Sequence, residues 1–449
     1  MKSQFKEVVR EKILQGVEKP SVGLTLTRRE ASPPLLKGKA VTVIGMRRSG
    51  KTCYLQQLRG DRLKEGIRRE SMVYFNFEDE RLAGFTAQDL NLIPSLHQRL
   101  FPDPTDGRRS YFLDEIQLVP EWEQFVRRLL DEGECDIFLS GPSARLLSRE
   151  VATAMRGRGW EVVITPFSFP EYLRHHNREP EQKPKFLQSR EKMRLDTEFQ
   201  NFLVTGGFPE AQGLPDSDRR QLLQSYVDVV LLRDIIERHK VSNATALRWM
   251  TRRLLANPAG LFSVTKFEAE LKSQGIGVGR ETLYQFLAYL EDAFLLQIVP
   301  IATDSEKRRQ VNPRKVYPLD PALGPVFDRS QKQNLGHALE VAVHNELFRR
   351  RAEAAYVKTK EGYEVDFLVR NTDGSHGLIQ VAADIDDAQT RKRECRALQA
   401  AAGEIRVDRQ LLLTAESRLP SPAVPSPIEV LPAWEWMMEG GGFLGEIGR

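Results

Sequence analysis

The sequence predicts an α/β protein: a parallel sheet covered by helices, then a mainly helical block, then a second α/β block. Short apolar segments alternate with helical segments over the first third of the chain, which is typical of parallel strands joined by crossover helices. Between residues 173 and 310 the apolar residues recur at helical spacing. Alternating strand and helix patterns resume after residue 311.

Five segments of the first block are expected to be buried strands. Each is short, apolar and rich in β-branched or aromatic residues. They are KAVTVIG (39–45), MVYFNF (72–77), SYFLDE (110–115), DIFLS (136–140) and WEVVI (160–164). The segments between them have helical spacing, as in EWEQFVRRLLDE at 121–132, so the five strands should form one parallel sheet.

We expect four parts: an N-terminal helical extension (1–38), an α/β domain (39–172), a helical block (173–310) and a C-terminal α/β domain (311–449). Within the helical block, residues 260–296 follow the order helix, Gly-rich turn, helix, strand, which is typical of a winged helix-turn-helix. The apolar stripe of its second helix should be buried. That stripe consists of Leu283, Phe286, Leu287 and Leu290.

Composition excludes several classes of protein. The 449 residues are 41% hydrophobic, enough for several cores, and carry a net charge of only +4. We find no run of about 18 apolar residues, so no membrane span is expected. Three widely separated cysteines without a CxxC pair argue against a disulfide framework or a zinc finger. Together with a charged N-terminus unlike a signal peptide, they favour a cytoplasmic protein.

A phosphate-binding loop follows the first strand. GMRRSGKT, from Gly45 to Thr52, fits the pattern G-x-x-x-x-G-K-[ST] between a strand and a helix. In such a loop the backbone N–H groups and the helix dipole hold phosphates. Lys51 should reach the β- and γ-phosphates, and Thr52 should coordinate Mg²⁺. The expected nucleotide-binding residues are Gly45, Arg47, Arg48, Ser49, Gly50, Lys51, Thr52 and Cys53, although Arg47 and Arg48 could equally face solvent or a partner.

Two acids end the third strand, where ligands of open α/β sheets bind. We expect Asp114 to hold the Mg²⁺ shell and Glu115 to polarise the attacking water. The alternative is an acidic N-cap for the next helix. The second acid and the absence of an N-K-x-D motif favour ATP hydrolysis over a GTPase.

Three further residues are candidates for catalysis. Ser140 ends the fourth strand, where it could orient water near the γ-phosphate or be a simple turn serine. Arg156 and Arg158 precede the fifth strand and could stabilise transition-state charge, in cis or from a neighbouring subunit. A finger supplied in trans would require a homo-oligomer, whereas solvated surface arginines are the alternative.

Several motifs together resemble one known family. GMRRSGKT, YFLDEIQLVPEW, LSGPSARLLSREVATAMRGRG and TPFSFPEYL occur in that order, followed by NFLVTGGFPEA, YVDVVLLRDIIERH, LGHALEVAVHNEL and EVDFLV. This series resembles the AAA-type P-loop ATPases of bacteria and archaea that carry a C-terminal restriction-endonuclease-like domain. The resemblance spans nearly the whole chain. It implies a P-loop NTPase sheet of the AAA+/ASCE type, with Lys51, Thr52, Asp114 and Glu115 in ATP hydrolysis.

The resemblance also implies a PD-(D/E)XK-type core in the last block. Such a site needs a helix acid, a strand Asp and (E/Q)-x-K on the next strand, because carboxylates hold Mg²⁺ while the lysine assists attack on the phosphate. Glu340, Asp366 and Gln380 take these positions as a possible metal site. Strand alternation places Gln380 and Ala382 on one face, so Ala382 stands where the lysine is expected. Alternation also places three apolar residues on the face opposite Asp366: Val365, Phe367 and Val369.

The missing lysine predicts that this domain does not cut DNA efficiently. Asp384, two residues after Ala382, adds negative charge on the same face. A migrated lysine, for which Lys358 or Lys360 are candidates, would restore an active, ATP-regulated nuclease. The domain could instead bind nucleic acid without cleaving it, or the acids could be ordinary polar residues of its surface.

The charge pattern leaves the nucleic-acid partner open. The expected recognition helix, 280–292, has one arginine against three acids, which is unfavourable for a phosphate-lined groove. The segment 306–315 has five basic residues against one acid, so DNA contacts are expected at Lys307, Arg308 and Arg309. The sequence therefore predicts a Mg²⁺-dependent ATPase that binds ATP. It acts as a switch or motor on nucleic acid or, alternatively, as a switch for protein assembly.

Overall fold

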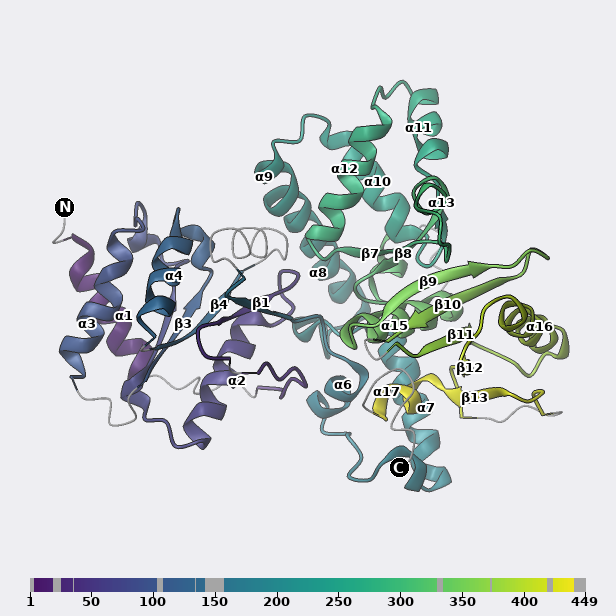
Figure 1. The fold of residues 1–449 in the computed structure, drawn as a ribbon, viewed down its shortest axis with the longest axis horizontal. Helices are drawn as coiled ribbons and strands as arrows, with labels where there is room; N and C mark the ends of the chain where they lie inside the picture. The colour runs from purple at the N-terminus through teal and green to yellow at the C-terminus, as the bar shows by residue number, and fades with distance from the viewer. Residues whose placement is uncertain are drawn as a thin grey trace. The chain divides into compact units, whose positions relative to one another are not determined.

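The structure is a computed structural model of the chain. It describes residues 4–18, 26–34, 36–102, 108–133, 135–141, 157–328, 334–371, 374–417 and 423–439. The chain forms two compact units, Met1–Thr165 and Pro166–Arg449 (Figure 1). The four-part division expected from the sequence stays a prediction.

A five-stranded parallel sheet forms the centre of the first unit, in the order β2-β3-β4-β1-β5. The strands are β1 (Ala40–Ile44), β2 (Met72–Asn76), β3 (Arg109–Asp114), β4 (Cys135–Ser140) and β5 (Gly159–Val163). All five predicted strands are confirmed to within one residue at each end. Because β4 lies between β1 and β3, the carboxyl ends of these three strands are neighbours at one edge of the sheet.

Helices cover both faces and one edge of this sheet. On one face, α2 (Lys51–Lys64) packs Tyr54 and Leu55 against Phe112 and Phe138, whose rings stack 4.4 Å apart. Figure 1 shows α4 (Trp122–Glu132) on the other face. The β2 edge is covered by α1 (Gln4–Glu18), which also packs on α3 (Leu92–Leu100). The described residues of the unit also form four short 3₁₀ helices: Arg69–Ser71, Glu80–Leu82, Asp89–Asn91 and Ile116–Leu118.

The second unit begins with helices. They are α6 (Phe169–His175), α7 (Ser189–Thr205), α8 (Asp216–Val229), a π-helical segment (Val230–Ile236), α9 (Glu237–His239) and α10 (Ala244–Ala256), with 3₁₀ turns at Pro184–Phe186 and Pro209–Ala211. A three-stranded antiparallel sheet follows, in the order β6-β8-β7. Its strands are β6 (Leu261–Phe262), β7 (Leu296–Val299) and β8 (Arg314–Pro318).

Two helices lie between β6 and β7, namely α11 (Val264–Ser273) and α12 (Arg280–Asp292). The predicted buried stripe of α12 is confirmed, since all four of its apolar residues are at most 3% exposed. The basic segment after β7 forms a short helix, α13 (Glu306–Val311), and the chain continues through β8 to α14 (Leu323–Phe327). This order of elements is consistent with a winged helix-turn-helix, which stays a prediction.

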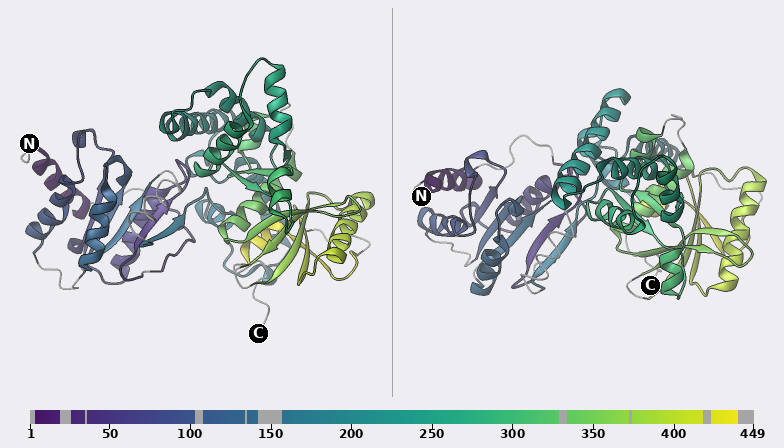
Figure 2. Two further views of the ribbon diagram at one scale, coloured as in Figure 1. Left: turned by 45° about the horizontal axis from the view of Figure 1, so that its top comes forward. Right: turned by 90° about the horizontal axis from the view of Figure 1, so that it is seen from above.

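A mixed five-stranded sheet forms the C-terminal part, in the order β13-β12-β11-β10-β9. The strands are β9 (Glu353–Lys358), β10 (Glu364–Arg370), β11 (His376–Ala382), β12 (Arg409–Thr414) and β13 (Ile428–Pro432). Strand β10 pairs antiparallel with both β9 and β11, whereas β12 pairs parallel with both β11 and β13. One core joins the sheet to α15 (Leu335–Arg349) and α17 (Ala433–Met438), and a second core joins it to α16 (Ala388–Glu404). Figure 2 shows α16 beside this sheet.

Strand β10 departs from the simple alternation expected of it. Phe367 and Val369 pack in the core on the α15 side, but Val365 packs with Leu368 in the core on the α16 side. The register with β9 shifts between Val365 and Leu368. A bulge inserts a residue and turns the following side chains over, so the expectation that Val365 shares a face with Phe367 and Val369 is wrong.

No helix among the described residues is long and apolar enough to cross a bilayer.

Candidate functional site

The loop between β1 and α2 requires glycine at its first residue. Gly45 has a φ of 145°, and a Cβ built there would lie 2.2 Å from the carbonyl oxygen of Ile164. Gly50, at the start of α2, has a φ of 99°. Arg48 adopts the left-handed conformation with a φ of 66°, an uncommon choice for a residue with a side chain. The two glycines of the motif therefore let the loop turn closely over the end of the sheet.

Lys51 is buried at the first position of α2. Its Nζ donates to the carbonyl oxygens of Gly45 and Met46, at 3.2 and 3.1 Å. The fully buried hydroxyl of Ser49 has no hydrogen-bond partner within the described part of the chain. A buried ammonium, an unsatisfied hydroxyl and a helix N-terminus together favour an anion.

The other predicted loop residues surround this point. Thr52 and Arg48 are exposed, whereas Arg47 and Cys53 are half-buried. Thr52 contacts an acidic side chain described below. Contact of Arg47, Arg48 and Cys53 with a nucleotide stays a prediction.

Arg29 supports the phosphate loop, although it lies outside the motif and 16 residues before it. This residue is 7% exposed. Its guanidinium donates to the carbonyl oxygen of Ser49 at 2.9 Å and to that of Thr165. Its backbone N–H and C=O both bond to the Gln57 side chain of α2, at 2.7 and 3.1 Å. No local motif marks such a residue, because its partners are distant backbone carbonyls.

Asp114 ends β3 and is fully buried. One carboxylate oxygen accepts hydrogen bonds from Thr52 Oγ1 at 2.9 Å and from the Tyr74 hydroxyl at 2.6 Å. The other accepts from the Ser140 hydroxyl. Burial, and secondly the Asp114 carboxylate, raise the pKa of Tyr74, so the phenol stays a donor. Three donors from three elements fix Asp114, and Tyr74 is the one that the sequence did not reveal.

Glu115 follows β3 in the left-handed conformation, with a φ of 56°. Its N–H donates to Ser140 Oγ at 3.0 Å, and Gln117 Nε2 donates to its carboxylate. Burial raises the pKa of Glu115, against a smaller opposing effect of the Lys51 ammonium. A buried carboxylate with a raised pKa next to the phosphate loop is suited to act as a general base.

Ser140 is the last residue of β4 and is fully buried, so it is not a turn serine. Its hydroxyl has a single proton, which Asp114 already accepts. In this arrangement Ser140 can position the two acids, but it cannot also donate to a phosphate or a water.

The site fits a magnesium ion bound with a nucleotide. Mg²⁺ prefers oxygen ligands and is usually held by one or two carboxylates together with substrate phosphates. Thr52 and Asp114 place a hydroxyl and a carboxylate 2.9 Å apart beside the loop. The described residues contain no group of three or more His, Cys, Asp and Glu side chains arranged for a metal, so phosphate oxygens and waters would complete the shell.

Arg158 lies away from this site. It immediately precedes β5, and its carbonyl oxygen accepts from the N–H of Ala40 at the start of β1. The loop and the acids lie at the opposite ends of these parallel strands. A five-residue strand spans about 16 Å, so Arg158 does not reach the phosphate loop of its own chain. Its guanidinium pairs with Asp131 of α4. The expectation of a finger in cis is therefore wrong for Arg158, and Arg156 lies outside the described residues.

A second polar centre lies in the C-terminal part, around Lys315 of β8. This side chain is 4% exposed, and its Nζ contacts Asp366 at 2.8 Å and both Glu340 and Glu364 at 3.0 Å. Glu340 Oε1 also accepts from the Tyr317 hydroxyl at 2.8 Å. Burial, and secondly the Asp366 carboxylate, raise the pKa of Glu340. The structure thus brings Glu340 and Asp366 together, but around an ammonium ion.

The side chain of Gln380 makes its hydrogen bonds to groups other than Lys315 and Glu340. Its Oε1 accepts from the backbone N–H of Asp366 at 3.2 Å, and its Nε2 donates to Glu394 of α16 at 2.8 Å. Among the described residues its side chain has no hydrogen bond to Glu340 or Lys315. The three predicted members of the metal site therefore do not converge on one point through their side chains.

The expectation that Lys358 or Lys360 replaces the missing lysine is wrong, since both are exposed. The lysine that does contact the carboxylates is Lys315, which lies on β8 of the three-stranded sheet. Its sequence position within a basic segment suggested a surface residue, and only the pairing of β8 with β6 and β7 places it inside.

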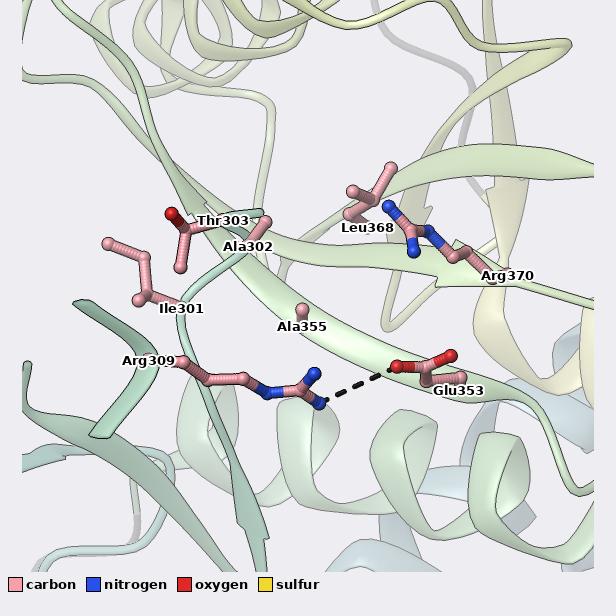
Figure 3. A pocket seen from close by; sticks show the side chains of 8 residues that line it. All are labelled: Ile301, Ala302, Thr303, Arg309, Glu353, Ala355, Leu368 and Arg370. Carbon is pink, nitrogen blue, oxygen red and sulfur yellow. Dashed lines mark ion pairs between the residues drawn. The ribbon is translucent and has the colours of Figure 1, made fainter. Parts of the chain in front are cut away.

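The three predicted nucleic-acid contacts all lie on α13. Lys307 and Arg308 are exposed, and Arg309 is half-buried. Figure 3 shows Arg309 paired with Glu353 of β9, at 3.5 Å, beside Arg370 of β10. The pocket that they line has a volume of about 30 Å³, room for one or two waters. It is too small for a nucleotide.

Family comparisons cover two regions of the chain. Residues 37–173 match the model of an AAA domain, and residues 196–333 match a domain of unknown function. The uncharacterised protein MJ1544 of Methanocaldococcus jannaschii is 31% identical over 421 residues, covering 91% of this chain and 90% of that protein. An uncharacterised protein of Haemophilus influenzae is 30% identical over 347 residues, covering 77% of this chain and 82% of that protein.

Solved structures resemble the chain more loosely. The Walker-type ATPase PABY2304 of Pyrococcus abyssi has 15% identity and a TM-score of 0.41, covering 72% of this chain and 95% of that one. AMPPCP-bound DnaA from Aquifex aeolicus has 16% identity and a TM-score of 0.24, covering 64% of this chain and 86% of that one. Both scores are low, so neither likeness defines what this chain acts on.

Proposed function

This chain belongs to the same family as MJ1544 of Methanocaldococcus jannaschii and contains an AAA-type ATPase domain. We propose that it is a Mg²⁺-dependent, ATP-driven switch. ATP binds to the loop between β1 and α2. Hydrolysis at the same edge of the sheet changes the conformation of the loop and strand ends around the γ-phosphate. In such switches this change is passed on to the attached segments.

The arrangement around Asp114 carries this proposal. Three elements supply donors to one carboxylate, while the adjacent Glu115 is turned out of the strand by its left-handed backbone. In this proposal Thr52 and Asp114 hold Mg²⁺, which when bound neutralises phosphate charge. Lys51 binds the β- and γ-phosphates, and Glu115 takes a proton from water. The side chain of Glu115 makes no capping hydrogen bond to the 3₁₀ turn that follows it, which argues against a merely structural N-cap.

Nucleic acid is the substrate class that we favour. Support comes from the basic residues Lys307 and Arg308, which are exposed on α13. The second candidate is a switch for protein assembly, favoured by the charge of α12, whose single arginine, Arg280, is paired with Glu268 at 2.8 Å. In both cases we propose that the C-terminal domain is a nuclease-like domain without efficient cleavage.

Steady-state ATP turnover with and without single-stranded and double-stranded DNA tests the proposal. We expect Mg²⁺-dependent turnover that DNA stimulates. Replacing Lys307, Arg308 and Arg309 together by Ala should weaken DNA binding and lower its salt dependence by a slope of roughly two to three. Basal turnover should not change, because these residues lie outside the ATP site.

The two candidates give different results. ATP turnover that DNA does not stimulate, together with ATP-dependent self-association, would favour the switch for protein assembly. Absence of ATP turnover under every condition would contradict both.

A further inference from the structure

The centre around Lys315 holds a cation that belongs to the chain itself. Carboxylate oxygens from α15 and β10 approach one Nζ at 2.8 to 3.0 Å. They come from Glu340, Glu364 and Asp366. Two of these contacts, to Glu340 and Asp366, are hydrogen bonds, and the third is an ion pair. We propose that Lys315 occupies the cation position of this carboxylate centre, so that the wild-type domain takes no divalent metal ion there.

Burial of the ammonium among carboxylates distinguishes this role from that of a migrated catalytic lysine. A lysine that assists attack on a phosphodiester must be accessible to the phosphate or the water. Lys315 Nζ donates hydrogen bonds to Glu340 and Asp366 and forms an ion pair with Glu364, and its side chain is 4% exposed. A substrate could therefore reach this ammonium only by displacing one of its carboxylate partners.

The carboxylates of the centre also accept hydrogen bonds from neighbouring groups of the chain. Asp366 Oδ2 accepts from the N–H of Val381 at 3.0 Å while Oδ1 accepts from Lys315. Glu340 Oε1 accepts from both Lys315 and the Tyr317 hydroxyl. A metal ion entering the wild-type site would have to displace the ammonium from these oxygens.

Removal of the ammonium should expose a site for a hard divalent cation. The oxygens would then surround a space without a positive charge, and carboxylates are the ligands that Mg²⁺, Ca²⁺ and Mn²⁺ prefer. A contraction of about 0.5 Å would bring oxygens now 2.8 to 3.0 Å from the centre to the roughly 2.3–2.6 Å typical of Ca²⁺.

The test compares Lys315→Ala, which empties the centre, with Lys315→Met, which fills it with an apolar chain of similar length. Mn²⁺ binding is measured in the full chain without nucleotide, by titration calorimetry and by the electron paramagnetic resonance signal of free Mn²⁺. We expect one additional Mn²⁺ in Lys315→Ala and none in the wild type or in Lys315→Met. The melting temperature of Lys315→Ala should rise by about 5 °C when Mn²⁺ is at roughly one hundred times its Kd.

Two controls assign the gained site. Adding Glu340→Gln and Asp366→Asn to Lys315→Ala should abolish Mn²⁺ binding, and Lys358→Ala, at an exposed lysine of β9, should gain none. If Lys315→Ala folds only with Mn²⁺, that rescue supports the proposal. A variant that stays unfolded with Mn²⁺ while Lys315→Met folds contradicts it.

This inference deepens the proposal that the domain is a nuclease-like domain without efficient cleavage, and the outcomes separate the two. Wild-type protein that binds Mn²⁺ at this centre and cuts plasmid DNA, with cleavage lost in Asp366→Ala, would overturn both. A folded Lys315→Ala that binds no Mn²⁺, beside a wild type that neither binds Mn²⁺ nor cuts DNA, would overturn the inference alone.

Discussion

Replacing Arg29 by Ala should destabilise the ATPase unit without touching any residue of the phosphate-binding motif. The substitution removes two hydrogen bonds from a buried guanidinium to the carbonyl oxygens of Ser49 and Thr165. Hydrogen bonds to a charged group contribute about 1.5 to 3 kcal/mol each, and the carbonyls left behind lose their donor. At the lower limit we expect a loss of about 3 kcal/mol.

The loss should be visible as a shift in melting temperature. For a unit of the size of Met1–Thr165, 1 kcal/mol corresponds to about 2 to 4 °C, so the shift should be about 6 to 12 °C. Differential scanning calorimetry can follow this unit separately, because its transition is the one that ADP or ATP raises. ATP affinity should also fall, since the Ser49 carbonyl belongs to the loop that holds the phosphates.

Arg28→Ala is the matched control. Arg28 is the adjacent residue, its side chain is 57% exposed, and it pairs with Asp61 at 2.7 Å. A surface pair of this kind contributes at most about 1 kcal/mol. If Arg29→Ala lowers the melting temperature no more than Arg28→Ala does, the loop is not supported by Arg29 and the reasoning is refuted.

Three other substitutions test separate parts of the account. If a neighbouring subunit supplies Arg158 in trans, Arg158→Ala should lower ATP turnover with little change in nucleotide affinity. An equal loss of turnover in Asp131→Ala, or a monomer whose turnover does not vary with protein concentration, would indicate that Arg158 is only part of a surface ion pair. Gln117→Leu removes a hydrogen bond that lowers the pKa of Glu115. Since the carboxylate form is active and is lost as the pH falls through an already raised pKa, the acid limb of the kcat profile should move to higher pH; an unchanged profile would exclude Glu115 as the titrating base. Gly45→Ala should destabilise the ATPase unit by about 3 kcal/mol, through strain and the contact with Ile164; calorimetry showing wild-type stability would contradict the close approach.

The fold of the ATPase unit could be predicted from the sequence because its signals are local. Each strand is a short apolar segment, and the phosphate loop and the acid pair are contiguous motifs at strand ends. The edge at which they meet follows from parallel pairing. The order β2-β3-β4-β1-β5 explains why Ser140 joins Asp114 and Glu115, since β4 lies next to β3.

The contacts that the sequence did not reveal are those between distant segments. Arg29 and Tyr74 act through partners that no spacing rule connects to them. Lys315 was counted among the basic residues of a surface segment, because formal charge alone does not show that a strand turns one lysine inward. The prediction of which β10 side chains share a face assumed strict two-residue alternation, and a bulge after Val365 interrupts that alternation.

The measurement that tests the central claim most directly compares ATP binding and turnover in Lys51→Ala and Glu115→Gln. Lys51→Ala removes the ammonium that holds the β- and γ-phosphates, so tight ATP binding should be lost. Glu115→Gln removes only the carboxylate that polarises water, so ATP should bind with near wild-type affinity, remain uncleaved and copurify with the protein. Equal loss of binding in both variants, or turnover that survives in Glu115→Gln, would contradict the roles assigned to these residues.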